Sequence, residues 1–546
     1  MTFVSGEFRR KTSMFRPMVC NDHNVPGRPI IPPVPSLLEG ELESGAAAEE
    51  TRDYIGDIRE TITTQEFLRS RDFGSSQSAR PINVDSLSRR KVSQMDLTEI
   101  SEGADDSRKF DDDLKPARTG TWLNATAHVV TAVIGSGVLG LPWSIAQLGW
   151  VVGSIMLIFF AWATFYTSAL LADCYRHHVT GRRNYTYMDA VNSHLGKKQV
   201  YLCAIAQYLN LLCTSIGYTV TSATSMVAVK RAICFHRNGH EAHCHVSNIP
   251  WMILFGGIQI FLSQLPDFSH LKFVSIVAAV MSAIYSFIGL GLSVARVSIN
   301  KHAKGPVWGT QLSAAQKTWS VFQALGNIAF AYSFCMVLIE IQDTVRGPPK
   351  YAMENVTMKK ATIWGISITT AFYTTVGCLG FAAFGIHAPG NILTGFGFYN
   401  PYWILAIGNI CVVIHLVGAY QVYVQPIFAA LERVVHNNWP RKNLIGFRLI
   451  TRTLFVIAVT LVASALPFFN DINGFIGAIS FFPLTVYFPT AMYIKSKGKA
   501  LTSTKELTMI WALRIISGLI TLVAIIGSVE GIRSSVQGTK LFHTKN

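Results

Sequence analysis

Long apolar runs separated by short polar segments fill the chain from residue 121 to residue 531. Each run is close to the roughly 20 residues that a helix needs to cross a bilayer. Eleven such runs occur, at about 121–146, 150–172, 202–229, 249–265, 271–296, 320–342, 360–385, 402–431, 449–467, 472–494 and 507–531. Because helices satisfy all their backbone groups within lipid, the pattern predicts an all-α membrane protein with about 11 transmembrane helices.

The first 117 residues lack this pattern. They hold 16 basic and 21 acidic residues, with many Ser, Pro and Gly and few apolar runs. Such a segment cannot bury enough apolar surface to offset its conformational entropy. We therefore predict a disordered cytosolic tail over 1–117, a membrane domain over 118–535 and a short C-terminal tail over 536–546. Within the long tail, Arg89 to Ser93 resembles a basic-directed kinase site, so a kinase is a candidate partner.

The first apolar run is interrupted in its middle, where three glycines and a proline fall within residues 135–142. Glycine weakens a helix and proline breaks it. Non-helical backbone at membrane depth is tolerated where it is buried in protein or lines a watery cavity, and its freed amides can then bind a ligand. A glycine-rich face for close helix packing is the alternative. The candidate substrate-binding residues here are Gly135, Ser136, Gly137, Val138 and Leu139.

A second interruption is expected five spans later. Carriers built as inverted repeats bind substrate at the bilayer midplane, where corresponding helices of the two halves are broken. If one repeat begins at Trp122, the other begins near Trp319, and the run from there carries a weaker signal with one glycine and no proline. Amides of the first span could bind a carboxylate and carbonyls of the sixth an ammonium; an ordinary packed span is the alternative. The candidates are Asn327, Ala329, Phe330 and Ser333.

The same repeat places the third and eighth spans over the site. The polar residues concerned are Asn210, Thr214 and Tyr218 on the third span and His415, Tyr420 and Gln421 on the eighth. Polar groups inside spans more often join helices than touch a ligand, so helix packing is the alternative for each. Asn210 is the substrate-binding candidate among them.

Coupling to protons requires a titratable group near the site. Only 11 acidic residues follow the tail, and nearly all lie at span ends or in loops. Glu340 and Asp343 close the sixth span and are the best-placed carboxylates. His128 lies about two turns before the first interruption and can change charge near physiological pH. Interfacial carboxylates and a helix-joining histidine are the alternatives.

Basic residues concentrate in alternate loops, and the positive-inside bias makes that side cytoplasmic. The N-terminus is then cytosolic and, with an odd number of spans, the C-terminus is extracellular. Cys234 and Cys244 fall in one polar outer loop, where an oxidising compartment permits a disulfide. A metal site made with the histidines of this loop is the alternative, although the spacing matches no common zinc pattern.

Several of these stretches together resemble the plant amino acid permease branch of the amino acid/auxin permease family. They include Gly135 to Trp150, Asn184 to Val191, Gln207 to Leu211, Ser263 to Phe268, Ile339 to Thr344, His415 to Val422 and Pro483 to Pro489. The resemblance implies a LeuT-like 5+5 inverted repeat with broken first and sixth helices, proton-coupled amino acid import at the plasma membrane and a paired-cysteine outer loop. Three departures are Asn327, where many relatives carry Asp, the lack of another Asp near Ala406, and Pro142 in place of Ala.

With this resemblance, we predict a symporter that imports amino acids with protons across the plasma membrane by alternating access. An amino acid sensor with a transporter fold and a carrier of auxin, proline or GABA are the alternatives. The expected partners are an amino acid, protons and the lipid bilayer, with no cofactor. The membrane part holds 31 basic and 11 acidic residues, which reflects topology and anionic lipid rather than nucleic acid. No nucleophile, metal or nucleotide motif points to an enzyme.

Overall fold

A computed structural model describes residues 117–239, 241–264, 269–346, 354–396, 401–436, 444–498 and 503–538. This part of the chain is helical. Its elements are α3 (Trp122–Val133), η2 (Ser136–Gly140), α4 (Leu141–Asp173), α5 (Tyr187–Leu195), α6 (Lys197–Asn238), α7 (Ile249–Ser263), α8 (Ser269–Asn300), α9 (Ala314–Ala331), η3 (Cys335–Val337), α10 (Leu338–Gln342), α11 (Glu354–Phe384), η4 (Gly385–His387), η5 (Ile392–Thr394), α12 (Tyr402–His436), α13 (Leu444–Ala465), α14 (Phe469–Ser480), the π-helix η7 (Phe481–Tyr487), α15 (Phe488–Lys497) and α16 (Thr504–Gly538).

The expected spans are all represented. Within the described residues, nine helical stretches are long and apolar enough to cross a membrane, and α7 is a shorter apolar helix. One of the nine, Ser136–Asp173, bends at Gly149 and so contains the end of the first span and the whole of the second. Counting this division and α7, the helices supply the eleven predicted spans, and the all-α fold class is confirmed.

The bend at Gly149 needs a glycine. Its φ is +83°, and a Cβ there would lie 2.3 Å from the carbonyl oxygen of Val307, in the segment that follows α8. Thr310 in this segment donates a hydrogen bond of 3.1 Å to the side-chain oxygen of Gln147. A side chain at Gly149 would combine an unfavourable φ with a direct clash, so the turn between spans one and two depends on this residue.

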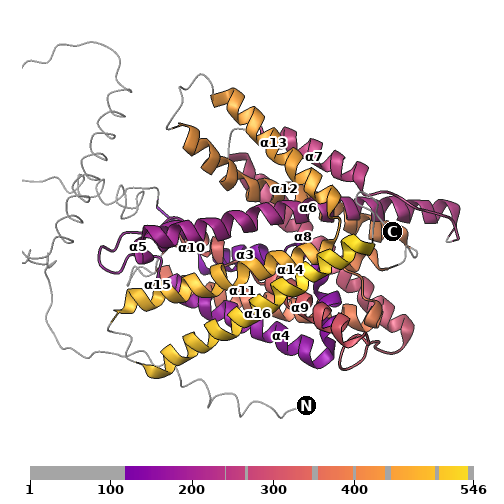
Figure 1. The fold of residues 1–546 in the computed structure, drawn as a ribbon, viewed down its shortest axis with the longest axis horizontal. Coiled ribbons are helices and arrows are strands. Elements are labelled where there is room, and N and C mark those ends of the chain that lie inside the picture. Colours follow the sequence, from indigo (N-terminus) through magenta and orange to yellow (C-terminus); the bar gives the residue numbers. More distant parts are fainter. Residues whose placement is uncertain are drawn as a thin grey trace, which may run out of the picture. The chain divides into compact units, whose positions relative to one another are not determined.

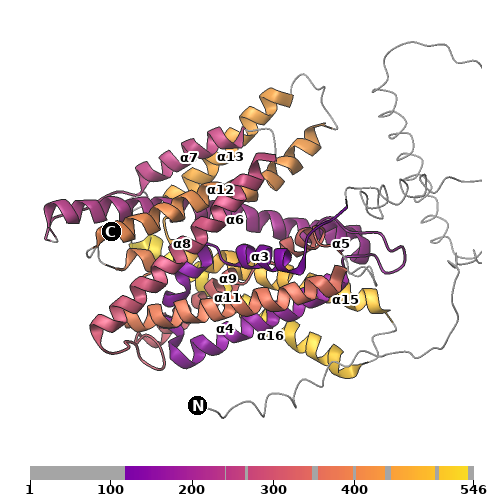
Figure 2. The same ribbon diagram turned by 180° about the vertical axis from the view of Figure 1, so that it is seen from behind.

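Corresponding spans of the two halves pack on each other. Span two (α4) lies against span seven (α11), span three (α6) against span eight (α12), and span four (α7) against span nine (α13), while η2 of span one contacts α9 of span six. Figures 1 and 2 show the α7 and α13 pair side by side from opposite directions. This pairing of each span with the one five places later is the arrangement expected of two repeated halves.

Both predicted interruptions exist, but the sixth span breaks later than expected. In the first span, α3 ends at Val133 and regular helix resumes at Leu141, with Pro142 in the first turn of α4. In the sixth span, α9 continues through Asn327 to Ala331, and the break lies at residues 332–334. Gly326 does not break the helix because it serves close packing: a Cβ there would lie 2.3 Å from the carbonyl oxygen of Gly474 in α14.

Some predicted features fall outside the described residues. These are residues 1–116 of the N-terminal tail, including its kinase-site pattern, and residues 539–546 of the C-terminal tail. Two described elements had not been predicted: α5, which begins with a capping box between Thr186 and Asp189, and η7 in the tenth span. Tyr187 at the start of α5 donates a hydrogen bond of 2.6 Å to the carbonyl of Leu484 in η7.

Candidate functional site

The two interrupted spans touch where each is unwound or ends. A Cβ placed on Gly137 in η2 would lie 2.9 Å from the Cα of Ala331, the last residue of α9. That distance is shorter than any side chain tolerates, so the backbones meet here only because residue 137 is a glycine. The contact fixes where the two half-helices face each other.

A small cavity of about 40 Å³ lies at this contact. Residues of α3, η2, α6, α9 and α12 and of the sixth-span break line it: Ala132, Val133, Gly135, Ser136, Gly137, Asn210, Thr214, Tyr218, Phe330, Ala331, Ser333 and Tyr423. At this size it holds a few water molecules. A bound amino acid would therefore require the half-helices to move apart.

The structure divides the ten candidate substrate residues into two groups. Six of them line the cavity: Gly135, Ser136, Gly137, Asn210, Phe330 and Ser333. The other four are buried but do not line it: Val138, Leu139, Asn327 and Ala329. Asn327 points its amide nitrogen at no hydrogen-bond partner, because α9 continues past it and turns its side chain into the helix packing. Whether any of these residues binds substrate stays a prediction.

Tyr373 of α11 joins the ends of the two half-helices. Its hydroxyl lies 2.5 Å from the carbonyl oxygen of Val133, which ends α3, and 3.3 Å from that of Ala331, which ends α9. The last carbonyls of a helix have no partner within it and carry partial negative charge. The single proton of this buried hydroxyl is thus shared between two facing helix ends, with the shorter contact at Val133. No local sequence signal marks Tyr373, since its two partners lie 240 and 42 residues away along the chain.

Replacing Tyr373 with phenylalanine should reduce amino acid uptake by about one order of magnitude. The buried carbonyl of Ala331 loses its side-chain donor, at a cost of about 1–3 kcal/mol, while that of Val133 keeps the backbone amide of Gly135 at 2.9 Å. Tyr332 offers a matched control. Its ring packs edge to face on Tyr373 with centroids 5.4 Å apart, and its hydroxyl makes one long contact of 3.4 Å to Thr370. Uptake per surface copy should fall in Tyr373→Phe and stay within twofold of wild type in Tyr332→Phe. Equal uptake in the two variants would contradict the role given to the helix ends.

Aromatic and hydroxyl side chains of α6 and α12 complete the wall of the small cavity. The rings of Tyr218 and Tyr423 meet edge to face with centroids 5.3 Å apart. The hydroxyl of Thr214 is buried and has no partner, so it can hydrogen-bond a bound molecule. Tyr423 was not predicted, because a tyrosine in an apolar run gives no signal of its own.

The candidates on the eighth span join helices to one another, which was the alternative to substrate binding. His415 hydrogen-bonds the carbonyl of Ala278 in α8 at 2.8 Å, and Gln421 donates to the side-chain oxygen of Gln259 in α7 at 2.6 Å. Tyr420 packs its ring on Phe255 of α7. These side chains join α12 to its neighbours and lie outside the cavity lining.

A second, larger cavity of about 320 Å³ lies towards the α5 end of α6. It shares Tyr423 with the smaller cavity, and Met336 on its wall accepts a 3.3 Å hydrogen bond from Asn210 on the other. Glu340 of α10 also lines it, with a backbone amide of Tyr187 donating to its carboxylate at 3.3 Å. The two cavities therefore form successive chambers along the sixth span.

The other two proton candidates lie away from the cavities. His128 is exposed on α3. Asp343 accepts a hydrogen bond of 2.5 Å from the hydroxyl of Tyr175 and lies 3.9 Å from the guanidinium of Arg183. Burial and this bond to Asp343 raise the pKa of Tyr175 above its ordinary value. These contacts place Asp343 in an ion-pair network rather than in a cavity wall.

That network ties together the ends of four spans. Glu354 at the start of α11 pairs with Arg118, which precedes α3, at 2.7 Å and with Arg176, which follows α4, at 2.5 Å. Beside it, the amide of Gly120 donates to the carbonyl of Thr344 at 3.1 Å, beyond α10. The cluster holds spans one, two, six and seven together at one end of the domain.

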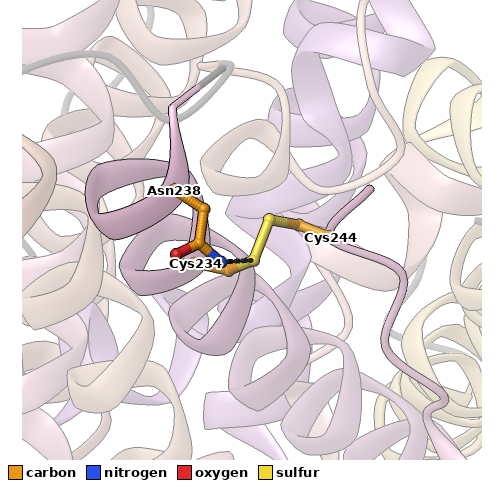
Figure 3. Close-up of a disulfide and its surroundings, with 3 residues drawn as sticks. All are labelled: Cys234, Asn238 and Cys244. Atoms are coloured by element: carbon orange, nitrogen blue, oxygen red, sulfur yellow. Dashed lines mark hydrogen bonds between the residues drawn. A yellow bond between two sulfur atoms is a disulfide. The ribbon is translucent and has the colours of Figure 1, made fainter. Parts of the chain in front are cut away.

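At the opposite end of α6 the structure joins Cys234 to Cys244 by a disulfide, with Cα atoms 6.0 Å apart (Figure 3). The amide of Asn238 lies 3.8 Å from the Cys234 sulfur. Among the described residues no three His, Cys, Asp or Glu side chains form a group that could hold a metal ion, and His240 of the alternative metal site is not described.

Comparisons with known proteins found a matching family model and similar sequences. Residues 118–534 match the family model described as "Transmembrane amino acid transporter protein". "Amino acid permease 3" of Arabidopsis thaliana is 49% identical over 462 residues, covering 80% of this chain and 96% of that protein. "Amino acid permease 6" of the same plant is 49% identical over 467 residues, covering 80% and 95%. A crystal structure of MhsT in complex with L-phenylalanine aligns with 76% of this chain and 100% of its own, at 11% identity and a TM-score of 0.49.

Proposed function

The chain belongs to the transmembrane amino acid transporter family, in its plant amino acid permease branch, and on that premise we propose that it imports amino acids with protons across the plasma membrane. The proposal is supported above all by the cavity at the crossing of the two broken spans. Backbone that lines a cavity at membrane depth is the place where carriers of this architecture hold a zwitterion.

The two chambers suit alternating access. The smaller cavity is enclosed by both half-helices, and the larger one continues from it along α10 towards the ion-pair network. Asn210 and Met336 lie between them and are hydrogen-bonded to each other. We infer that substrate held at the breaks leaves through the larger chamber when this contact opens.

The lining favours amino acids with uncharged side chains. No Asp, Glu, Lys, Arg or His occurs among the described residues that line the smaller cavity. A charged substrate side chain would there lose its hydration without gaining a counter-ion, which costs several kcal/mol. The α-carboxylate and ammonium differ, because the C-terminal ends of α3 and α9 present partial negative charge to an ammonium and amides of the first-span break can donate to a carboxylate.

The orientation follows from loop charge. The end that holds α5 and the ion-pair network carries most of the basic loop residues, so we infer that it faces the cytosol. The disulfide loop then lies outside the cell, where oxidising conditions maintain such bonds. The larger chamber accordingly opens on the inner side, as release of an imported substrate requires.

Electrical recording from oocytes that express the chain tests the proposal. Neutral, acidic and basic amino acids are applied at an acidic and at a near-neutral external pH. We expect inward currents with neutral amino acids that grow at the acidic pH, because each cycle would carry a net proton charge. Absence of current with normal surface expression would oppose proton symport, and labelled uptake would then separate an electroneutral carrier from a sensor. Competition with auxin, proline and GABA would identify a different solute.

A further inference from the structure

Of the two carboxylates that are buried among the described residues, Glu354 is paired with arginines and Asp471 has no cationic partner. Several other carboxylates of the domain are neutralised by basic side chains: Asp173 by Lys359, Glu354 by Arg118 and Arg176, Glu432 by Arg448 and Arg452, and Glu530 by Arg533. Asp471, in the first turn of α14, is only 8% exposed and has no such ion pair. An intramembrane acid without a counter-ion is a candidate functional site.

Neutral donors from two other helices hold this carboxylate. The side-chain amide of Gln323 in α9 donates to one oxygen of Asp471. The hydroxyl of Ser535 in α16 donates to the other at 2.7 Å. Both bonds favour the ionised form, while burial without a cation favours the protonated form.

Glycines let the three helices close around Asp471. A Cβ on Gly531 of α16 would lie 2.9 Å from an Asp471 carboxylate oxygen. A Cβ on Gly474 of α14 would lie 3.1 Å from the backbone oxygen of Gln323. The site is therefore built by close backbone approach, which leaves the three helices little room to rearrange around the carboxylate.

Among the described residues of the neighbouring helices, no other charged side chain pairs with Asp471. On α16, Glu530 and Arg533 pair with each other at 3.2 Å, and on α9 the nearest charged residue is Lys317, nearly two turns before Gln323. α6 also packs on α14, but its charged residues Lys230 and Arg231 lie more than three turns beyond Gly217, which faces Asn473 of α14. The charge state of this pocket is thus set by Asp471 itself.

We propose that Asp471 takes up the coupling proton on the side of the disulfide loop and passes its state to the substrate cavity through Gln323 and α9; this rests on the proposed proton symport. An ionised carboxylate accepts hydrogen bonds from both Gln323 and Ser535. A protonated one must present its own O–H and so gives up one of these two acceptor positions. α9 carries Gln323 and ends at Ala331 in the cavity wall. A change in the hydrogen bond between Gln323 and Asp471 can therefore shift the half-helix that closes on the substrate.

Asp471→Asn tests the assignment, since the amide has the size of the carboxylate and cannot ionise. Occupancy of one proton site changes up to about tenfold per pH unit. We expect the variant to lose this pH dependence of uptake while exchange of labelled for unlabelled amino acid across the membrane continues. Glu530→Gln, which removes a charge from the neighbouring helix, should keep the wild-type pH profile.

A second variant covers the case in which Asp471→Asn does not reach the surface. Ser535→Ala removes a donor to the ionised form, so half-maximal uptake should move to higher pH. Wild-type pH profiles in Asp471→Asn, or in Ser535→Ala where the first variant fails to fold, would overturn the assignment and leave proton symport standing. If uptake by the wild-type protein did not depend on pH, both proton symport and the role of Asp471 would be overturned.

Discussion

Replacing Gly137 with leucine should abolish amino acid uptake while surface expression is retained. A Cβ at this position already lies 2.9 Å from the Cα of Ala331, and a leucine adds three more carbon atoms at the crossing of the two broken spans. The overlap is with backbone, so no side chain can turn away to relieve it. One half-helix must move, and the cavity wall moves with it.

Labelled uptake and surface biotinylation, measured together, give the result per surface copy. Gly291→Leu is the matched control, because a Cβ at Gly291 in α8 meets nothing within 4 Å and that residue is exposed. It should transport as wild type does. Uptake by Gly137→Leu at the level of Gly291→Leu would show that the crossing of the half-helices is not part of the substrate path.

Replacing Glu354 with glutamine should destabilise the folded domain more than the same change at an exposed acid. The Glu354 side chain is 3% exposed and is shared by Arg118 and Arg176. Removing one member of a buried ion pair costs about 3–5 kcal/mol, because the remaining charge loses its compensation. Here two guanidinium groups lose the same carboxylate partner at once.

Heating the detergent-solubilised protein and following the remaining monodisperse fraction measures this effect. Glu530→Gln is the comparison, since the pair between Glu530 and Arg533 is 32% and 64% exposed and such pairs contribute about 0–1 kcal/mol. The midpoint temperature should fall clearly for Glu354→Gln and little for Glu530→Gln. Similar midpoints for both would mean that the buried network contributes no more than a surface pair.

The sequence predicts those parts of the site that depend on local chemistry. Three glycines and a proline within residues 135–142 disfavour a helix wherever they occur, and the first break is found there. The positions of the spans follow from the length of apolar runs in the same way. The third-span stripe of Asn210, Thr214 and Tyr218 also lines the cavity, because helical spacing alone brings the three onto one face.

Other parts depend on contacts between distant segments. The sixth break lies beyond Asn327 because Gly326 is used for packing on Gly474, almost 150 residues away. The roles of Tyr373 and Asp471 depend on hydrogen-bond partners in other helices. A single tyrosine or a first-turn aspartate in the sequence does not predict such partners. The sequence alone therefore indicates where the helix of the first span breaks. It does not indicate which contacts stabilise the two breaks.

The backbone pairing of Gly120 with the segment after α10 has a mechanical consequence for the N-terminal tail. Gly120 donates to Thr344 at 3.1 Å and accepts from the amide of Arg346 at 2.8 Å. Any tension on the first 116 residues thus reaches the domain through this joint before it reaches α3. A pull on the tail would therefore be shared by spans one and six, the two spans that cross at the small cavity.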